Sequence, residues 1–387
     1  MSRTLRLIAF NIVLTLLIAE VALRIIGPRL PGQVGVALRY VTTGSPYDQQ
    51  WSPAWQQNRD HYYALKPGLT DSLQYGSPGV QFRLTTRELW EGGGIGFRAP
   101  VVDFFVDGVV VGDSFGLCFT EQADCWVDQL QGLTGRRFVN LSQPVTGTRS
   151  HLRILQDFGA PLKPPLVIWQ FFGNDFNDDY GLAVFRGEIE PVEAEAAPPE
   201  PADAAMWLRR SSALFAAVET ALNGRYLGLP SSEALFAKPY TIRYGPNNEH
   251  TLMLGGQYEL QALDMSREAN QIGYEMSREA FAAAQSLVAG WGGQMIVVII
   301  PTREEVYSPL AAPALGQDHI QRLQSARDAM LDLCSALALV CYDAYEALQP
   351  RAALGEALYH ADDMHLNATG NQALAEWLAE RLPPPAP

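Results

Sequence analysis

Five short and almost continuous apolar runs constrain the fold of this chain more than any other feature of its sequence. They alternate with stretches of helical periodicity and lie at residues 108–111, 137–142, 164–172, 293–300 and 337–344. Such runs are typical of parallel strands, because crossover helices cover both faces of a parallel sheet. Residues 106–382 are therefore predicted to form an α/β, doubly wound domain on a five-stranded parallel sheet. Its helices are expected at about 124–133, 149–158, 264–290, 318–335 and 369–382.

One insertion, at about residues 184–260, interrupts this alternation. Its acidic part, residues 188–203, contains six carboxylates and several prolines, so it is predicted to be a loop or linker. The amphipathic run at 206–222 is predicted to be a helix. Packing on the main domain, covering the site and lying on a membrane all remain open for this helix.

The N-terminal segment has 17 consecutive residues without a basic side chain, between Arg6 and Arg24. As a helix this stretch is roughly 26 Å long, enough to cross the hydrocarbon core of a bilayer. Glu20 opposes that reading, but it can pair with Arg24 one helical turn later. Residues 5–27 are therefore predicted to be a transmembrane signal anchor, uncleaved because small residues are not in register for a cleavage site.

This anchor predicts a single-pass membrane protein in contact with the lipid bilayer. Arg3 and Arg6 favour a cytoplasmic N-terminus, which places the main domain in the periplasm or outside the cell. Residues 28–105 are rich in glycine, proline and aromatic side chains and are expected to form a juxtamembrane segment with short strands.

The four cysteines form two pairs with a spacing of seven residues, Cys118 with Cys125 and Cys334 with Cys341. An extracytoplasmic compartment permits two local disulfides, and four buried free thiols are the alternative. The cysteines lack the Cys/His spacing of a zinc site. No residue pattern indicates a metal, nucleotide or redox cofactor, so none is expected.

The charge balance excludes one large class of functions. Against 42 acidic residues the chain has 28 basic ones, which gives a formal net charge of −14. A chain with this charge repels the phosphates of nucleic acids and the headgroups of anionic lipids. We therefore expect no nucleic-acid partner.

Polar residues suited to acyl transfer follow the first three strands. The first strand runs into the G-x-S-x-G pattern at 112–116, in which glycines permit a tight turn that exposes Ser114. The second leads to Gly147 and the third to Gly173 and Asn174. A glycine N–H and an asparagine carboxamide beside a serine are donors that stabilise an oxyanion, although each is also a common turn residue.

A histidine with a nearby carboxylate stands close to the C-terminus. Asp362 precedes His365 by three residues, a spacing at which its carboxylate can accept the Nδ1–H within one turn. With Ser114 these residues would complete a catalytic triad. Metal binding is the rival interpretation, but His360 and Asp363 lack further partners at ligand-like spacing.

GDSF at 112–115, Gly147, GND at 173–175 and D-x-x-H at 362–365, in this order, resemble the SGNH/GDSL hydrolase superfamily. The resemblance covers residues 106–382, and GIGFRAP at 94–100 is similar to the segment before the first strand in membrane-anchored members. It implies a flavodoxin-like, three-layer α/β/α fold. An ordinary α/β-hydrolase shares G-x-S-x-G, but it would place several more strands before the serine.

The resemblance also implies a role for each matching residue. Ser114 is the nucleophile, His365 the base and then the acid, and Asp362 the group that orients His365. The oxyanion hole consists of the Ser114 and Gly147 N–H groups with the Asn174 side chain. The supporting residues around them are Gly112, Asp113, Gly173 and Asp175.

These observations predict a membrane-anchored serine esterase that hydrolyses acyl esters, plausibly O-acetyl groups on glycans. An O-acyltransferase would use the same residues, and a catalytically incidental subunit of a larger membrane complex is an alternative of another class. Asp175, Asp178 and Asp179 are expected either near the mouth of the site, where they disfavour anionic acyl groups, or in a solvated loop.

Overall fold

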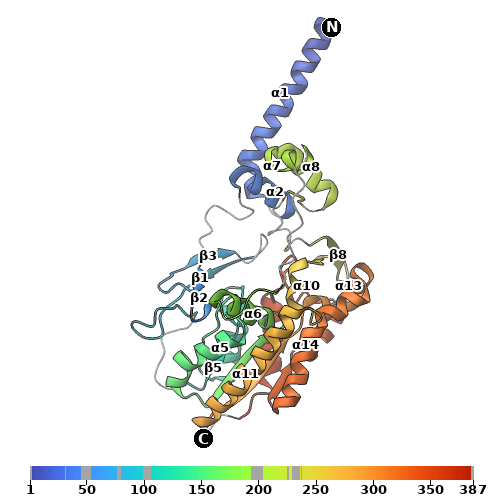
Figure 1. Ribbon diagram of the computed structural model, residues 1–387. Helices are drawn as coiled ribbons and strands as arrows, with labels where there is room; N and C mark the ends of the chain where they lie inside the picture. Colours follow the sequence, from blue (N-terminus) through green and yellow to red (C-terminus); the bar gives the residue numbers. More distant parts are fainter. Residues whose placement is uncertain are drawn as a thin grey trace.

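The computed structural model describes residues 2–30, 32–44, 54–75, 80–98, 106–192, 204–224, 226–228, 236 and 238–384. An α/β body contains the predicted sheet, and a long helix, α1, projects from a smaller group of helices beside it (Figure 1). Most of the predicted acidic linker, residues 193–203, lies outside the described residues.

The central sheet has five strands, all parallel, in the order β11-β10-β7-β5-β6. Read from the β6 edge, with the strands numbered in chain order, the order is 2-1-3-4-5. This is a doubly wound arrangement, so the predicted fold class is confirmed. One row across the sheet runs through Asn140, Val110, Ile168, Ile296 and Val340. The strands are β5 (Gly108–Val111), β6 (Phe138–Asn140), β7 (Leu166–Phe172), β10 (Gln294–Ile300) and β11 (Val340–Asp343).

Helices cover both faces of this sheet, as right-handed crossovers require. On the face turned to the viewer in Figure 1 lie α5 (Thr148–Ile154), α6 (Asp175–Arg186), α11 (Glu268–Gly290) and α14 (Gln317–Leu337). Two helices, α4 (Trp126–Thr134) and α16 (Ala368–Ala379), pack on one another at the other face. The expected helices thus match α4, α5, α11, α14 and α16.

The body also contains further short helices. They are α3 (Ser114–Leu117), α10 (Gln257–Leu263), α12 (Arg303–Val306), α13 (Ser308–Leu315) and α15 (Tyr345–Ala353).

Short antiparallel ribbons flank the body. One joins β1 (Trp55–Asn58) to β2 (Tyr62–Leu65), a second joins β3 (Ser72–Tyr75) to β4 (Gln81–Leu84), and a third joins β8 (Tyr240–Tyr244) to β9 (His250–Leu254). The first two lie within the segment in which short strands were expected.

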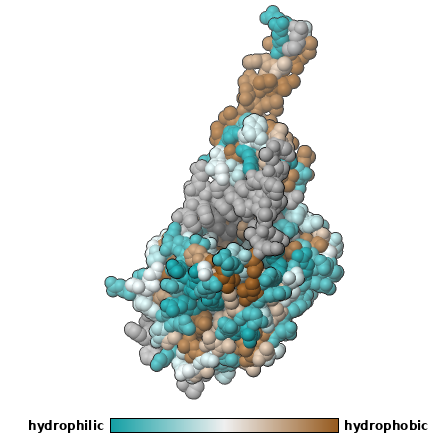
Figure 2. All heavy atoms as spheres, viewed as in Figure 1, coloured by the Kyte–Doolittle hydropathy of each residue, from teal (hydrophilic) through white to brown (hydrophobic). Residues whose placement is uncertain are grey.

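The described residues contain one helix long and apolar enough to cross a membrane, spanning Arg3–Arg29 with a mean hydropathy of 2.1. Within it, α1 (Arg3–Ile26) buries none of its residues and stands out as a hydrophobic column (Figure 2). The expected pair forms, with Arg24 Nε 2.8 Å from Glu20 Oε1.

The helix predicted at 206–222 is two helices, α7 (Ala204–Ser211) and α8 (Ala213–Asn223). They are separated at Ser212, whose extended backbone and side-chain oxygen cap the start of α8. They pack beside the end of α1 and on α2 (Gly32–Thr43), so packing on the α/β body, which the sequence left open, is wrong (Figure 1).

Both cysteine pairs are disulfides, Cys118 with Cys125 and Cys334 with Cys341. The alternative of four free thiols is therefore wrong. The first bridge ties the residue after α3 to the start of α4, and the second ties α14 to β11.

Candidate active site

Ser114 lies at the first position of α3, directly after the buried strand β5. Asp113 caps this short helix, because its Oδ1 accepts the Phe115 N–H at 2.7 Å. The flanking glycines allow neighbours to approach closely: a Cβ on Gly112 would lie 2.3 Å from Gln170 Oε1, and one on Gly116 would lie 2.1 Å from Ser142 Oγ. The G-x-S-x-G pattern is thus required by packing around the turn that presents Ser114.

His365 lies against the serine. Its Nε2 is 2.7 Å from Ser114 Oγ, a hydrogen-bond distance at which the imidazole can take the hydroxyl proton. The ring packs against Phe115 and Phe119, with centroid distances of 4.7 and 4.1 Å. Both Ser114 and His365 are more than nine-tenths buried, so the pair is shielded from bulk water.

The carboxylate that contacts His365 is Asp363, and the prediction of Asp362 is corrected. Asp363 Oδ1 lies 2.5 Å from His365 Nδ1 and also accepts the His365 backbone N–H at 2.9 Å. The prediction assumed a helical turn, but residues 361–365 form successive bends, so a residue two positions earlier folds back onto the ring. Asp362 is half-buried, and its charge acts on His360 instead.

Asp363 is held in its ionised form. Burial alone would raise the pKa of this carboxyl. The charge of His365 and the hydrogen bonds that it donates lower the pKa well below its ordinary value. A carboxylate at Nδ1 fixes the proton there and leaves Nε2 free to accept the proton of Ser114.

Gly147 precedes α5 and lies against the start of α6. A Cβ at this position would be 2.4 Å from the Asp175 carbonyl oxygen and 2.5 Å from Asp179 Oδ1, so only glycine brings the two helix starts this close. Asp179 also accepts the Arg149 N–H at 2.8 Å and bonds to the hydroxyls of Thr148 and Ser277. These contacts hold the loop that carries Gly147.

Asn174 follows β7 and caps α6. Its Nδ2 donates to Asp178 Oδ2 at 2.9 Å, and its side chain also hydrogen-bonds to the Tyr258 hydroxyl, so an oxyanion would replace one of these partners. Gly173 before it is packed tightly, since a Cβ there would lie 2.4 Å from Leu263 Cδ2. The turn after β7 also meets the serine turn, because the Phe172 and Phe115 rings are 4.3 Å apart.

The acidic side chains near these turns lie inside the fold, so the expectation of a solvated loop is wrong. Asp113, Asp175, Asp178 and Asp179 are all buried. Burial raises the pKa of Asp113 and Asp179 to about 6 and raises the pKa of Asp175 and Asp178 well above the ordinary value. Their mutual repulsion adds to this effect at Asp175 and Asp178.

Two buried arginines near the site were not predicted as site residues. Arg98, within GIGFRAP, donates to the carbonyl oxygens of Leu117, Cys118 and Thr120, which fixes the chain after Ser114. Arg303 donates to the Asp363 carbonyl oxygen at 2.8 Å and so supports the triad loop. A capping box at Thr302 and Glu305 marks the start of the helix that carries Arg303, a pattern visible in the sequence.

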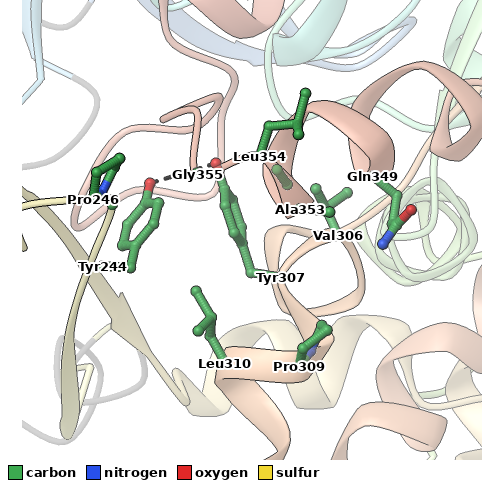
Figure 3. A pocket seen from close by; sticks show the side chains of 12 residues that line it. Tyr244, Pro246, Val306, Tyr307, Pro309, Leu310, Gln349, Ala353, Leu354 and Gly355 are labelled. Atoms are coloured by element: carbon green, nitrogen blue, oxygen red, sulfur yellow. Dashed lines mark hydrogen bonds between the residues drawn. The ribbon is translucent and has the colours of Figure 1, made fainter.

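An apolar cavity of about 390 Å³ lies apart from these residues (Figure 3). Tyr244 and Leu310 line it together with Tyr307, and the two tyrosine hydroxyls are 3.4 Å apart. Tyr307 Oη also accepts the Leu358 N–H at 2.8 Å, at the start of the segment that leads to His365. None of the triad or oxyanion residues lines this cavity. Among the described residues, no three His, Cys, Asp or Glu side chains gather as a metal site.

No family model and no curated protein matches the sequence. Among solved structures, the chain is similar to a lipase/acylhydrolase from Enterococcus faecalis, with 12% identity, a TM-score of 0.37, and coverage of 72% of this chain and 99% of that one. A variant of an acetyl-xylooligosaccharide esterase from Geobacillus gives 10% identity, a TM-score of 0.39, and coverage of 71% and 93%. A GDSL-like lipase from Bacteroides thetaiotaomicron gives 10% identity, a TM-score of 0.32, and coverage of 71% and 87%.

Ser114 and His365, 251 positions apart in the sequence, are in hydrogen-bond contact, and Gly147 and Asn174 follow the two strands that flank the serine strand. The four sequence blocks on which the resemblance rests thus lie at the carboxyl edge of the sheet.

Proposed function

We propose that this protein is a serine esterase that cleaves acyl esters through an acyl-enzyme. The observation that carries the proposal is the continuous chain of contacts from Ser114 Oγ to His365 Nε2 at 2.7 Å and from His365 Nδ1 to Asp363 Oδ1 at 2.5 Å. A serine, a base and an orienting carboxylate in this sequence of contacts are the parts that activate a hydroxyl for acyl transfer.

In the proposed reaction, Ser114 Oγ attacks the ester carbonyl carbon while His365 Nε2 takes the hydroxyl proton. The carbonyl oxygen becomes an oxyanion, which the Ser114 and Gly147 N–H groups and Asn174 Nδ2 stabilise. As the bond to the alcohol oxygen breaks, His365 donates its proton to the leaving alkoxide. Water then attacks the acyl-serine with His365 again as base, which releases the carboxylic acid and restores Ser114.

The proposed substrate carries a small acyl group, such as acetyl, on a glycan hydroxyl. Ser114 is 9% exposed and His365 is 7% exposed, and the rings of Phe115 and Phe119 flank the histidine. Low exposure of the nucleophile and the base favours short acyl chains over long ones. Transfer of the acyl group to a sugar hydroxyl uses the same residues, because a sugar hydroxyl then replaces water in the second step.

We further propose that α1 anchors the enzyme in a membrane, with the α/β body in an oxidising, extracytoplasmic compartment. The exposed apolar surface of α1 supports the anchor. The two disulfides support the compartment, because such bridges persist where thiols are not kept reduced.

Turnover of p-nitrophenyl acetate and p-nitrophenyl octanoate by the full chain in detergent tests the activity. We expect hydrolysis of the acetate ester at a higher kcat/KM than the octanoate, and loss of both activities in Ser114→Ala. Addition of a sugar acceptor separates the two reactions, since acylated sugar appears only with a transferase. Folded wild-type protein without turnover of either ester would contradict the proposal.

A further inference from the structure

The end of α1 is joined to α8 by a carboxylate that an apolar helix would not otherwise carry. Glu20 Oε1 accepts the Ala213 N–H and Oε2 accepts the Leu214 N–H, each at 2.8 Å. Glu20 Oε2 also accepts the Ser212 hydroxyl at 3.0 Å. These bonds satisfy free N–H groups at the start of α8, where the helix dipole also favours a negative charge. The position of α8 along α1 is thereby fixed.

The exposed apolar surface of α1 continues past this junction. Val21, Ile25 and Ile26 are 55%, 62% and 61% exposed. Ile26 lies six residues after Glu20, which corresponds to about 9 Å along the helix axis. The start of α8 is therefore attached about 9 Å before the end of the apolar column, an offset comparable to the depth of about 5 to 10 Å to which interfacial helices are buried.

α8 carries two large aliphatic side chains that the rest of the described structure leaves exposed. Its buried residues are small, Ala213, Ala216 and Thr220, and Ala216 packs on Val36 and Ala37 of α2. Leu214 and Phe215 are half-buried, whereas Val218 is 52% and Leu222 is 82% exposed. Trp207 of α7 is 68% exposed as well. We call Trp207, Val218 and Leu222 the α7–α8 face.

The charge of this region differs in sign from that of the whole chain. The region counted here is the second half of α1, the chain from there to the end of α2, and the two helices α7 and α8. Its described residues include five arginines and two glutamates, namely Arg24, Arg29, Arg39, Arg209, Arg210, Glu20 and Glu219. The formal charge is thus +3 here, against −14 for the chain. Basic residues beside an apolar face are typical of helices that lie at lipid headgroups.

We propose that the α7–α8 face binds the lipid bilayer at the boundary between headgroups and acyl chains. This inference rests on the proposed membrane anchor, of which α7 and α8 form an interfacial extension. Contact at a second place beside α1 prevents the region from pivoting freely about one helix. Trp207 supplies an aromatic side chain of the kind enriched at this boundary.

Spin labels on the full chain in nanodiscs of phosphatidylcholine and phosphatidylglycerol test the proposal. The described cysteines are all in disulfides, so a new thiol is labelled selectively without reductant. Trp207→Cys and Leu222→Cys report on the α7–α8 face. Leu14→Cys reports on the middle of α1, and Leu354→Cys, at a residue 77% exposed on the α/β body, is the aqueous control. Collision rates with oxygen and with a nickel chelate give the depth of each label.

We expect the Leu14→Cys label in the hydrocarbon core, the Leu354→Cys label in water, and both labels of the α7–α8 face between them in depth. The inference would be overturned if the labels at 207 and 222 were as accessible to the nickel chelate as the label at 354. If the label at 14 were then still in lipid, the anchor would remain intact. Labels at 207 and 222 protected from both reagents would overturn it in favour of a protein partner. A label at 14 in water would show that the anchor itself is wrong.

Discussion

Asp363 and His365 are joined twice although one residue separates them: Asp363 Oδ1 lies 2.5 Å from His365 Nδ1 and accepts the His365 backbone N–H at 2.9 Å. A single oxygen thus fixes both the ring and the main chain of the histidine. Arg303 holds the Asp363 carbonyl oxygen from the other side. The orientation of His365 is therefore set by the bend at 361–365 and by Arg303, which follows the end of β10.

Replacing this carboxylate tests the corrected triad. Asp363→Asn is expected to lower kcat for acyl transfer by about 10²- to 10⁴-fold, because an amide no longer stabilises the imidazolium or fixes the proton at Nδ1. Ester turnover under saturating substrate measures the effect. Asp362→Asn is the matched control and is expected to keep kcat within a few-fold of wild type. Equal losses in the two variants would contradict the assignment of Asp363.

The oxyanion role of Asn174 has a control on the same helix. Asn174→Ala is expected to lower kcat by about 10²- to 10³-fold with little change in KM, because the lost donor acts on the transition state. Asn177, whose Nδ2 bonds to Asn270 at 2.8 Å, lies one turn away. Asn177→Ala should leave kcat near wild type, and a loss as large as that of Asn174→Ala would point to a fault in α6 instead.

Gly147 and Gly132 give opposite expectations for the same substitution. Gly147→Ala places a Cβ against the Asp175 carbonyl oxygen, so we expect the free energy of unfolding to fall by about 1 to 3 kcal/mol. Gly132 lies within α4 with open space around it, and Gly132→Ala should raise the same quantity by about 0.5 to 1 kcal/mol. Urea unfolding of both variants checks the signs, and a neutral Gly147→Ala would contradict the close packing described here.

The buried Asp113 predicts a particular pH dependence. Because burial raises its pKa from 3.8 to about 6, the carboxyl contributes stability that is present in acid and is lost as the pH rises through 6. The free energy of unfolding of Asp113→Asn, minus that of wild type, should therefore rise between pH 4 and pH 7 by roughly 2 to 3 kcal/mol.

Burial lowers the pKa of His151 to about 3, so its contribution to the free energy of unfolding grows as the pH rises over part of this range. The charge of Asp113 raises the pKa of Asp175 and Asp178, so their contributions change with the substitution, whereas that of His151 is common to both proteins and cancels in the difference. Urea unfolding at four or five pH values measures it, and a difference independent of pH would show that Asp113 is not a buried acid with a raised pKa.

The strands and most of the site are predictable because both depend on local patterns. Apolar runs mark strands buried on two faces, and the glycines at 112 and 147 mark places where no Cβ can fit. The choice between Asp362 and Asp363 depends on a bend whose conformation no periodicity encodes. The same holds for Glu20, whose partners at 212–214 are almost 200 residues away. Arg98 and Arg303 lie beside recognisable patterns, GIGFRAP and a capping box, but their partners are main-chain carbonyl groups that the sequence does not identify.

Fluorophosphonate labelling of the full chain in detergent, read by intact mass, tests the central claim most directly. The reagent reacts with a serine only where a base has activated it. The account predicts one adduct per wild-type molecule and none in Ser114→Ala or His365→Ala, with both variants folded by circular dichroism. Folded wild type that takes up no label, or Ser114→Ala that is labelled as fully as wild type, would contradict it.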